Sequence, residues 1–303
     1  MISDFLTKNQ ASISFREGAI INNSGALIVD DGVFFQGASE EPVNLIVQDT
    51  FSGKPLRIAF QDDSLSVVRL IFAGGASGDI EVEITLRPRS KVIMTQMFLQ
   101  VSNNPAKIGL KATVLEQADL RIDDCILHEG QLHLTDTYQL MGVGANLYHR
   151  TLHIASNSDR LTRTQAVFHQ AQKTISELEN YLIAAQAARL KYDVRGIIEK
   201  GNKGSSCNQT NRGLIFGEQA EIEADPNLLI DEYDVFAAHG AAIGQVSEDE
   251  LFYLQSRGLS ELEAKKLILS GYVAPFLKAV ADADIEQYIN DLIEAKIKGA
   301  GIV

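Results

Sequence analysis

Several residue types that mark particular protein classes are rare or absent in this chain. Among its 303 residues there is no Trp, and only two residues are Cys and six are Pro. Cys125 and Cys207 cannot form a disulfide framework, and neither has a nearby Cys or His at the spacing of zinc ligands. Because aromatic residues make up only 7% of the chain, a stacking platform for sugars or single-stranded nucleic acid is poorly supported.

Basic residues are also outnumbered. The chain has 27 Lys and Arg against 40 Asp and Glu, a formal net charge of -13 at pH 7, which disfavours contact with nucleic acid and anionic lipid. Its apolar runs, such as Leu228–Ile230, are far shorter than the ~20 residues of a membrane span. Residues Met1–Lys8 lack the basic and apolar parts of a secretory leader. We therefore expect a folded cytoplasmic protein without a nucleic-acid or membrane partner.

Between about Ile13 and Ile243 the sequence alternates apolar and polar residues, as half-buried strands do. The run Ile80–Leu86 is an example, and short turn clusters such as Glu129–Gly130 separate the runs. Many short strands joined by short turns suit a sandwich, a barrel or a β-solenoid, and periodicity alone does not choose among them. One segment, Lys173–Lys191, places apolar residues at helical spacing and is a possible helical interruption.

After Val246 the apolar spacing changes to that of helices. Ser247 is followed three residues later by Glu250, the pattern of an N-terminal capping box. Gly258 follows a cationic residue and tolerates the left-handed conformation that ends a helix. A short helix is therefore predicted between them, with Leu251 and Leu254 facing inward.

Two further helices are predicted beyond this short one. Ser260 and Glu263 repeat the capping pattern, and Asp282 or Asp284 precedes a last helix that runs to about Ile297. The apolar stripe expected on the middle helix comprises Ala264, Leu267, Ile268, Tyr272, Phe276, Leu277 and Val280, and that on the last helix comprises Ile285, Ile289, Leu292, Ile293 and Ile297.

The glycine-rich segment Gly201–Ser206 resembles a phosphate-binding loop in composition only. Glycines beside a lysine and a hydroxyl can cradle phosphate oxygens. Here Lys203 is not next to Gly201, and no helical pattern follows. We interpret the segment as an ordinary glycine turn.

The histidines of the middle of the chain invite a metal-site interpretation. His149 and His153 are four residues apart, but their surroundings predict a strand, on which the rings would lie ~13 Å apart. His128 and His133 lie on either side of the turn at Gly130. We expect exposed or hydrogen-bonded histidines at these positions rather than a chelate.

The two thiols differ in their neighbours. Two aspartates precede Cys125 and would raise its pKa, so a small buried apolar residue is the favoured interpretation. Cys207 lies in a polar stretch with basic residues nearby, which makes it the better candidate for a reactive or metal-binding thiol. An inert thiol is the alternative, because no other ligand accompanies it at a suitable spacing.

An acidic segment surrounds one histidine near the end of the predicted strands. No Lys or Arg occurs between Arg212 and Arg257, and His239 lies there among the small residues of Phe236–Gly244. Small neighbours leave an imidazole accessible to a ligand or to a partner backbone. The carboxylates either supply further ligands for a cation or form a solvated acidic face.

An ordered series of motifs runs from about Tyr192 to Tyr272. It comprises Asn211–Ile215, Ala220–Ala224, Asp225–Ile230, Asp234–Val235, His239–Ala241, Ile243–Gly244, Leu251–Leu254 and Ser256–Gly258. The series resembles the SufB/SufD family of the SUF iron–sulfur cluster assembly system. The resemblance implies a mainly β fold, a right-handed parallel β-helix, for residues 1–245. It also implies a C-terminal α-helical segment, residues 246–303, that docks a SufC-like ATPase.

The resemblance further implies a scaffold without catalysis of its own. Such a chain pairs with a SufB-like paralogue, or with itself as a homodimer, and helps to assemble a transient iron–sulfur cluster at the SufB–SufD interface. No cofactor is expected to be permanently bound by this chain alone. The partner contacts implied are Tyr233, Val235, His239, Gly240, Leu251, Phe252, Tyr253, Arg257 and Gly258.

The SufD-like form of the motif is the better match. SufB carries Glu directly after the histidine, whereas Gly240 follows His239 here, and some SufD members have Cys where this chain has Ala237. His239 is then one cluster ligand among thiolate and carboxylate from the partner, and Cys207 is a weaker candidate. Two alternatives stay open: a structural homodimer without cluster chemistry, and a β-helix enzyme acting on acidic polysaccharide, for which secretion and a basic groove would be expected.

Overall fold

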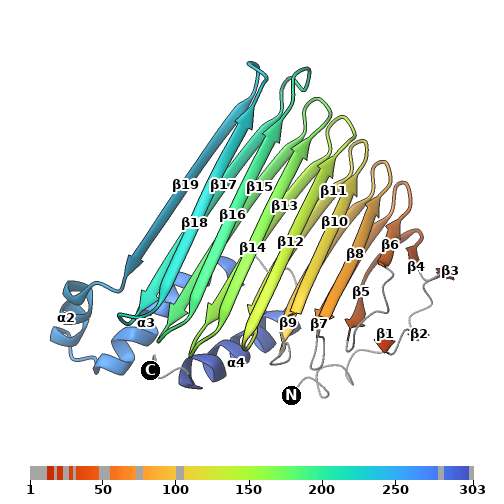
Figure 1. Ribbon diagram of the computed structural model, residues 1–303. Helices are drawn as coiled ribbons and strands as arrows, with labels where there is room; N and C mark the ends of the chain where they lie inside the picture. The colour runs from red at the N-terminus through yellow and green to blue at the C-terminus, as the bar shows by residue number, and fades with distance from the viewer. Residues whose placement is uncertain are drawn as a thin grey trace.

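The chain folds into two long β-sheets with helices at its C-terminal end (Figure 1). The computed structural model describes residues 12–16, 19–22, 27–29, 32–47, 55–72, 78–99, 106–278 and 283–299. From β5 onward, successive strands alternate between the two sheets, so that each strand pairs in parallel with the strand two places along the chain. This arrangement is a parallel β-solenoid, and it confirms the fold class that the motif series implied.

The ten-stranded sheet contains, in spatial order, β19 (Phe236–Gln245), β17 (Ser206–Phe216), β15 (Ile175–Ala185), β13 (Asn146–Ala155), β11 (Asp119–Leu127), β9 (Lys91–Leu99), β7 (Leu65–Phe72), β5 (Ala38–Val47), β1 (Ser12–Arg16) and β2 (Ala19–Asn22). The nine-stranded sheet contains β18 (Glu221–Ile230), β16 (Arg189–Ile198), β14 (Arg160–His169), β12 (Gln131–Leu140), β10 (Ala106–Val114), β8 (Gly78–Leu86), β6 (Leu56–Phe60), β4 (Gly32–Phe35) and β3 (Leu27–Val29).

The coils stack in register but differ in length. Arg57 lies beside Glu83, 26 residues away, whereas Lys191 lies beside Glu223, 32 residues away. The differences in length are taken up at the turns between strands, so a constant sequence period is not needed for a regular stack. At the N-terminal end, β1–β2 and β3–β4 are antiparallel pairs.

The main core lies between the two sheets. Alternate residues of each strand point inward, and rows of apolar side chains such as Ile80, Ile108 and Leu134 stack from coil to coil. Because the side-chain period of a strand is two, the register of one coil decides which residues of the next are buried. Each fully buried Leu or Ile contributes about 1.5–3 kcal/mol relative to exposure, and these rows therefore hold the coils together.

A second core covers part of the outer face of the ten-stranded sheet. In β11, β13 and β15 the burial pattern is alternating in the first half and continuous in the second half. The outward side chains of those second halves, among them Cys125, Leu152 and Ile183, pack against Val273 and Ile289 of the C-terminal helices. The helices therefore lie across the ends of these strands, as Figure 1 shows.

Three described helices follow β19: α2 (Glu248–Ser256), α3 (Glu261–Leu277) and α4 (Ala283–Gly299). Ser247 accepts a hydrogen bond from the Glu250 amide at 3.4 Å, and Ser260 with Glu263 forms a complete capping box. Gly258 has φ +95° directly after α2, which confirms the left-handed cap. Residue Asp282 lies outside the described residues, so the predicted cap there is not described.

The possible helix at Lys173–Lys191 is wrong, because β15 and β16 occupy this segment. Leu178 and Leu182 are four residues apart, and this separation fits both one helical turn and two strand repeats. Both side chains point into the solenoid core. The ladder of parallel neighbours on either side of β15 decides for the strand.

The helical faces also differ in part from the prediction. In α2 no described residue is buried, so Leu251 and Leu254 are only half-buried. In α3 the side chain of Leu267 is exposed and Leu269 is buried instead. Because Leu267–Leu269 are all apolar, the sequence of α3 is compatible with more than one buried face. Contact with the sheet decides that the face with Leu269 is the buried one. The division into domains at residues 245 and 246 stays a prediction.

Candidate functional site

The last coil of the solenoid is open. Among the described strands, β18 pairs only with β16, and β19 only with β17. Nearly every residue of β19 is exposed, and β18 is half-buried at best. Strand edges with free N–H and C=O groups are templates for pairing with another chain. This end therefore has the character of an interaction surface.

His239 lies on this open end. It pairs in register with Gln209 and continues the inward row formed by His149 and Leu178. The other members of that row are buried, whereas His239 is exposed because no coil follows β19. A Cβ atom added at Gly240 would have no neighbour within 4 Å. The ring and the adjacent backbone are thus accessible from outside.

A groove of about 410 Å³ lies beside His239. Besides His239, its lining includes Glu177, Glu179, Asn208 and Thr210. Within the described part of the chain, however, no group of three or more His, Cys, Asp or Glu side chains is close enough to hold a metal ion. The described residues around His239 therefore do not form a metal or cluster site by themselves.

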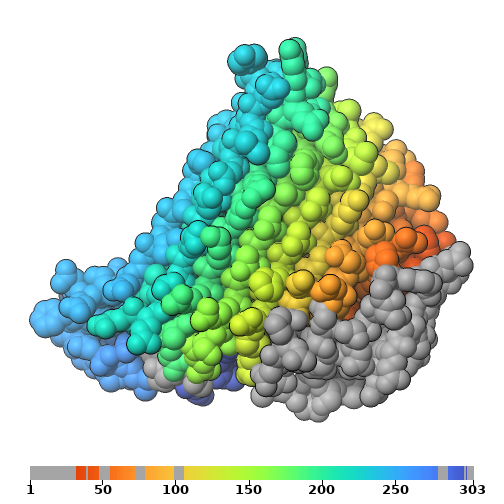
Figure 2. All heavy atoms as spheres, viewed as in Figure 1, coloured from red at the N-terminus to blue at the C-terminus, as the bar shows by residue number. Residues whose placement is uncertain are grey.

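Apolar side chains flank the open strands at both ends. At the β18–β19 turn Tyr233 is fully exposed and Phe236 is 66% exposed, and Leu229 and Val235 lie near them. At the opposite end of β19, α2 exposes Phe252 and Tyr253, and this part of the chain projects from the body in Figure 2. Scattered exposed apolar residues are normal, but clusters beside unpaired edges mark binding surfaces.

The remaining implied contacts lie at the end of α2. The Arg257 guanidinium is 5.2 Å from the centre of the Tyr253 ring, a cation–π contact. Gly258 then turns the chain into α3, with its amide donating to the Gln255 carbonyl at 2.9 Å. The structure therefore places Arg257 and Gly258 with Tyr253, but it does not bring α2 together with His239.

Cys207 is not part of the exposed surface. Its side chain is buried in the solenoid interior, and a Cβ at Gly196 on the opposite sheet would overlap its Sγ atom. Burial raises the pKa of Cys207, and a hydrogen bond with Ser176 offsets this only in part. Cys207 pairs in register with Ala237, two residues before His239, so a strand separates the thiol from the open end.

Cys125 is buried among apolar residues between β11 and α4, as predicted. Burial is the main cause of its raised pKa, and the charge of Asp124 adds to it. The segment Gly201–Ser206 is a turn with φ +99° at Gly201 and φ +72° at Gly204, which confirms the interpretation as a glycine turn.

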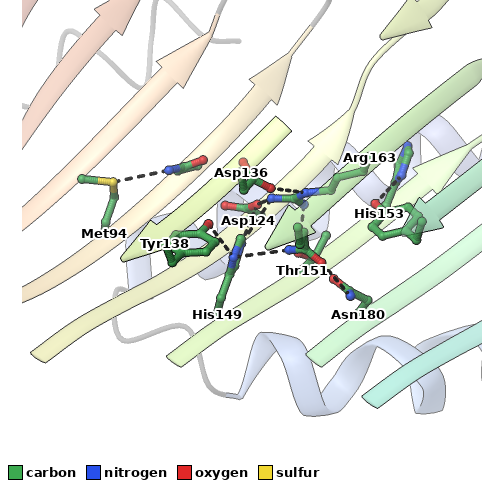
Figure 3. Close-up of polar contacts among 12 residues, drawn as sticks. Met94, Asp124, Asp136, Tyr138, His149, Thr151, His153, Arg163 and Asn180 are labelled. Atoms are coloured by element: carbon green, nitrogen blue, oxygen red, sulfur yellow. Dashed lines mark hydrogen bonds and ion pairs between the residues drawn. The ribbon is translucent and has the colours of Figure 1, made fainter. Parts of the chain in front are cut away.

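A buried polar network crosses the solenoid interior (Figure 3). Arg163 on β14 donates from Nε to Asp136 at 2.6 Å and from Nη2 to Asp124 at 2.5 Å, and its Nη1 donates to Thr151 at 3.0 Å. His149 Nε2 lies 2.8 Å from Asp124 Oδ2. These side chains come from both sheets and are buried, so the network ties one sheet to the other.

Burial and charge act in opposite directions within this network. Burial alone would raise the pKa of Asp124, but His149 and Arg163 outweigh it and hold the pKa below its usual value. Burial dominates at Asp136 and raises its pKa, because Arg163 offsets it only in part. Sequence reasoning missed this network. The only available signal was the presence of Asp124, Asp136 and Arg163 at inward positions of predicted strands.

A second buried chain joins three rings. Tyr192 OH lies 3.0 Å from His153 Nδ1, and His153 Nε2 lies 3.2 Å from His128 Nδ1. His128 Nε2 lies 3.2 Å from the Arg160 carbonyl oxygen. The prediction of exposed or hydrogen-bonded histidines is confirmed: His128, His149 and His153 are hydrogen-bonded, and His133 is exposed.

The fold and the open end define a class: a β-solenoid that presents the edges of its last coil, and not a closed pocket, to a partner. Comparison with known proteins is more specific. Residues 63–272 match the family model "SUF system FeS cluster assembly, SufBD core domain". This match covers more than half of the chain, and the protein therefore belongs to the SufBD core family.

Individual relatives agree with this assignment. The iron–sulfur cluster assembly protein SufD of Bacillus subtilis is 28% identical over 173 residues, which are 57% of this chain and 40% of the relative. SufD of Escherichia coli is 32% identical over 90 residues, 30% of this chain and 21% of the relative. SufB of Bacillus subtilis is 29% identical over 163 residues, which are 53% of this chain and 34% of the relative.

The aligned segments therefore span less than half the length of each of these relatives. The family membership concerns the solenoid and the helices that directly follow it. In the part of the chain that the structure describes, no helix is both long and apolar enough to cross a membrane.

Proposed function

We propose that this chain is a SufD-like scaffold subunit for the assembly of iron–sulfur clusters, without catalysis of its own. The observation that carries this proposal is the SufBD core match over residues 63–272. The exposed imidazole of His239 on the open last coil supports it. In this proposal the cluster is cargo that is formed and passed on, and ATP hydrolysis belongs to a SufC-like partner.

Pairing would use the edges of β18 and β19. The partner would extend both sheets by strand addition, in which main-chain hydrogen bonds supply affinity. Residues Ala237–Ala242 of β19 are small apart from His239, which allows a partner backbone to approach closely. A SufB-like paralogue is the proposed partner, and a second copy of this chain is the alternative.

His239 would supply one neutral nitrogen ligand to iron. Imidazole binds iron well, whereas iron–sulfur clusters also need thiolate ligands. Because no further ligand cluster exists among the described residues, the thiolate and carboxylate would come from the partner across the interface. The buried Cys207 is a weaker candidate, since its raised pKa disfavours the thiolate that binds metal.

Substitution of His239 tests the ligand role. We expect His239→Ala to fold normally, because the side chain is exposed, and to lose iron and sulfide in anaerobic reconstitution with SufB-like and SufC-like partners. His133→Ala is the matched control, since His133 is exposed on β12, away from the open end. Equal iron and sulfide contents in the two variants would refute the ligand role.

Docking of the ATPase would use α2 and the helix that follows. Phe252 and Tyr253 are exposed, so the double substitution Phe252→Ser with Tyr253→Ser should leave the fold intact and weaken binding of the SufC-like ATPase. Met141→Ser is the control, because Met141 is 51% exposed at a solenoid turn. If the double substitution and Met141→Ser weaken binding of the ATPase equally, the ATPase does not dock on α2.

The same reconstitution separates the alternatives. A structural homodimer without cluster chemistry would sediment as a dimer alone and bind no iron or sulfide beside the two partners. A chain that remains unpaired alone but co-sediments with the SufB-like paralogue, and binds iron there, supports the scaffold proposal.

A further inference from the structure

The C-terminal helix α4 is joined to the solenoid by one buried ion pair. Lys296 Nζ lies 2.9 Å from Asp159 Oδ2 and 2.9 Å from the His128 carbonyl oxygen. The two side chains are 11% and 5% exposed. The Lys296 side chain reaches from α4 to a carboxylate that is shielded from water. Such a contact is specific, because removal of either charge leaves the other one buried without its partner.

Asp159 joins this ion pair to the turns of two coils. Its Oδ1 accepts from the Gly130 amide at 2.9 Å, and its Oδ2 accepts from the Ser156 amide at 3.0 Å. Gly130 lies between β11 and β12, and Ser156 lies between β13 and β14. The carboxylate is therefore held in place by the solenoid whether or not Lys296 is present.

The other described contacts between α4 and the sheet are apolar. Tyr288, Ile289 and Ile293 are buried, and Leu292 packs partly buried against the same cluster. A groove of about 280 Å³ separates α4 from α3, with Val273 and Ile293 among its lining residues. Loss of the ion pair would leave α4 with these apolar contacts, so the helix would open locally at a lower free energy than with the ion pair in place.

The hydrogen bonds among His128, His153 and Tyr192 show which ring nitrogens carry a hydrogen. The Arg160 carbonyl can only accept, so His128 Nε2 carries the hydrogen and His128 Nδ1 is an acceptor. His153 Nε2 then donates to His128 Nδ1, and the Tyr192 hydroxyl donates to His153 Nδ1. Both imidazoles are neutral in this arrangement, and the free acceptor position of His128 is occupied by His153.

The charged and titratable groups that act on His128 come from several elements. Burial lowers the pKa of His128 to about 4, Asp159 opposes this, and Lys296 adds to it. Burial is the main cause that lowers the pKa of His153 on β13, and the charges of Arg163 and Lys296 add to it. Departure of Lys296 removes a positive charge and leaves Asp159 as the nearest charge to His128.

We propose that Lys296 and Asp159 form a latch that holds α4 on the solenoid, and that its opening is accompanied by uptake of one proton at Nδ1 of His128. The proton comes from solvent, and the positive charge that forms on His128 partly offsets the charge lost with Lys296, which acts on the same ring. His128 Nδ1 then donates to His153 Nε2, and His153 carries its hydrogen on Nδ1, which donates to the Tyr192 hydroxyl, so the direction of these hydrogen bonds reverses. The inference concerns contacts within this chain alone and goes beyond the proposed pairing and docking.

The sign of the pH dependence follows from the two states. Burial is the main cause of the low pKa of His128, about 4, and Lys296 lowers the pKa further while the latch is closed, so this pKa rises when Lys296 leaves. The open state therefore binds more protons, and opening becomes easier as pH falls from the open-state pKa toward about 4. The opening equilibrium should change by up to about tenfold per pH unit in this window.

Hydrogen exchange of the α4 amides in the full chain measures the opening. Protection factors, which correct for the intrinsic pH dependence of exchange, are compared at pH 7.5 and pH 5. We expect Lys296→Met to lower α4 protection at least tenfold. The control Lys298→Met should change it less than twofold, because Lys298 is exposed and lies 3.8 Å from Glu294 within the same helix. Unchanged protection in Lys296→Met would overturn the latch.

The proton is tested separately. In His128→Gln the pH dependence of α4 protection between pH 7.5 and pH 5 should disappear, and its persistence would overturn the assignment to His128. An NMR titration of the His128 ring, which needs no change at that residue, provides a second measurement. We expect a higher pKa of His128 in Lys296→Met than in the unchanged chain, and equal values would contradict the coupling between Lys296 and His128.

Discussion

Arg163 is a fully buried cation whose partners, Asp124 and Asp136, are buried as well. Taking three charges out of water is costly, and the interaction repays this cost only while all partners are present. Asp124 keeps a lowered pKa and Asp136 has a raised one, so the network is sensitive to the loss of the Arg163 guanidinium. Its contribution is best measured by removal of that cation.

We predict that Arg163→Met lowers the free energy of unfolding by about 3–5 kcal/mol, because two carboxyl groups remain buried without the guanidinium that they share. Urea unfolding measures the change. The matched control is Arg57→Met, which breaks an Arg–Glu pair of the same cross-strand kind on the surface, at 3.2 Å from Glu83, and should cost a small fraction of that loss. Similar losses in both variants would show that burial of the network is unimportant.

His169 provides a second prediction at this scale. It is buried, its ring nitrogens lie 2.7 Å from Thr174 Oγ1 and 2.9 Å from Ser176 Oγ, and burial lowers its pKa to about 4. The unfolded chain, with an ordinary pKa near ~6.5, binds the proton more readily. The contribution of neutral His169 to the free energy of unfolding is therefore fully present above about pH 6.5 and is lost as pH falls toward about 4.

We expect His169→Gln to reduce the loss of unfolding free energy between pH 7 and pH 4.5, by up to ~1.4 kcal/mol for each pH unit of the window. Urea midpoints at four pH values measure it. His133→Gln is the control, because His133 is exposed. If both variants follow the unchanged chain, His169 does not contribute to acid sensitivity.

At the scale of elements, the turns decide how closely coils stack. Gly142 lies in the turn after β12, over the turn after β10, where its amide donates to Val114 O at 3.3 Å. A Cβ atom at Gly142 would overlap the Glu116 amide and the Leu115 carbonyl carbon. Backbone cannot move aside as a side-chain end can, so this turn requires glycine.

We predict that Gly142→Ala lowers the unfolding free energy by about 1–3 kcal/mol, the usual cost of overpacking. Gly240→Ala should have no such effect on the isolated chain, because nothing lies within 4 Å of its added Cβ. Thermal unfolding compares the two variants. A stable Gly142→Ala variant would mean that the coils can separate without loss.

The strand elements also show where sequence patterns are ambiguous. Alternation identified the strands around β8 and β12, whose two faces differ in polarity. In β15 the second half is buried on both faces, by the core and by α3. Burial on both faces removes the strict alternation that identifies a strand, so the four-residue separation of Leu178 and Leu182 fitted a helix equally well.

For the whole molecule, the helices and the solenoid depend on each other. The outer ends of β11, β13 and β15 present Cys125, Leu152 and Ile183 to an apolar cluster that they share with α3 and α4. The predicted boundary at residues 245 and 246 therefore separates two kinds of secondary structure across a shared apolar contact.

Removal of residues 247–303 tests this dependence. We expect the shortened chain to keep its β-sheet circular dichroism but to bind an apolar dye strongly and to aggregate, because the outer face of the ten-stranded sheet is uncovered. The full chain with Phe252→Ser and Tyr253→Ser is the control, since α3 and α4 remain in place. A shortened chain that is monomeric and binds no dye would establish an independent solenoid domain.

The sequence by itself determined the elements of this protein: strands by alternation, helices by capping residues such as Ser260 and Glu263, and the family by an ordered series of motifs. Only the tertiary structure decided what covers each face. It buried Cys207, left His239 exposed, and brought Lys296 to Asp159, 137 residues away. The physical reason is that alternation identifies which side chains share a face, whereas burial depends on neighbours contributed by distant coils and helices.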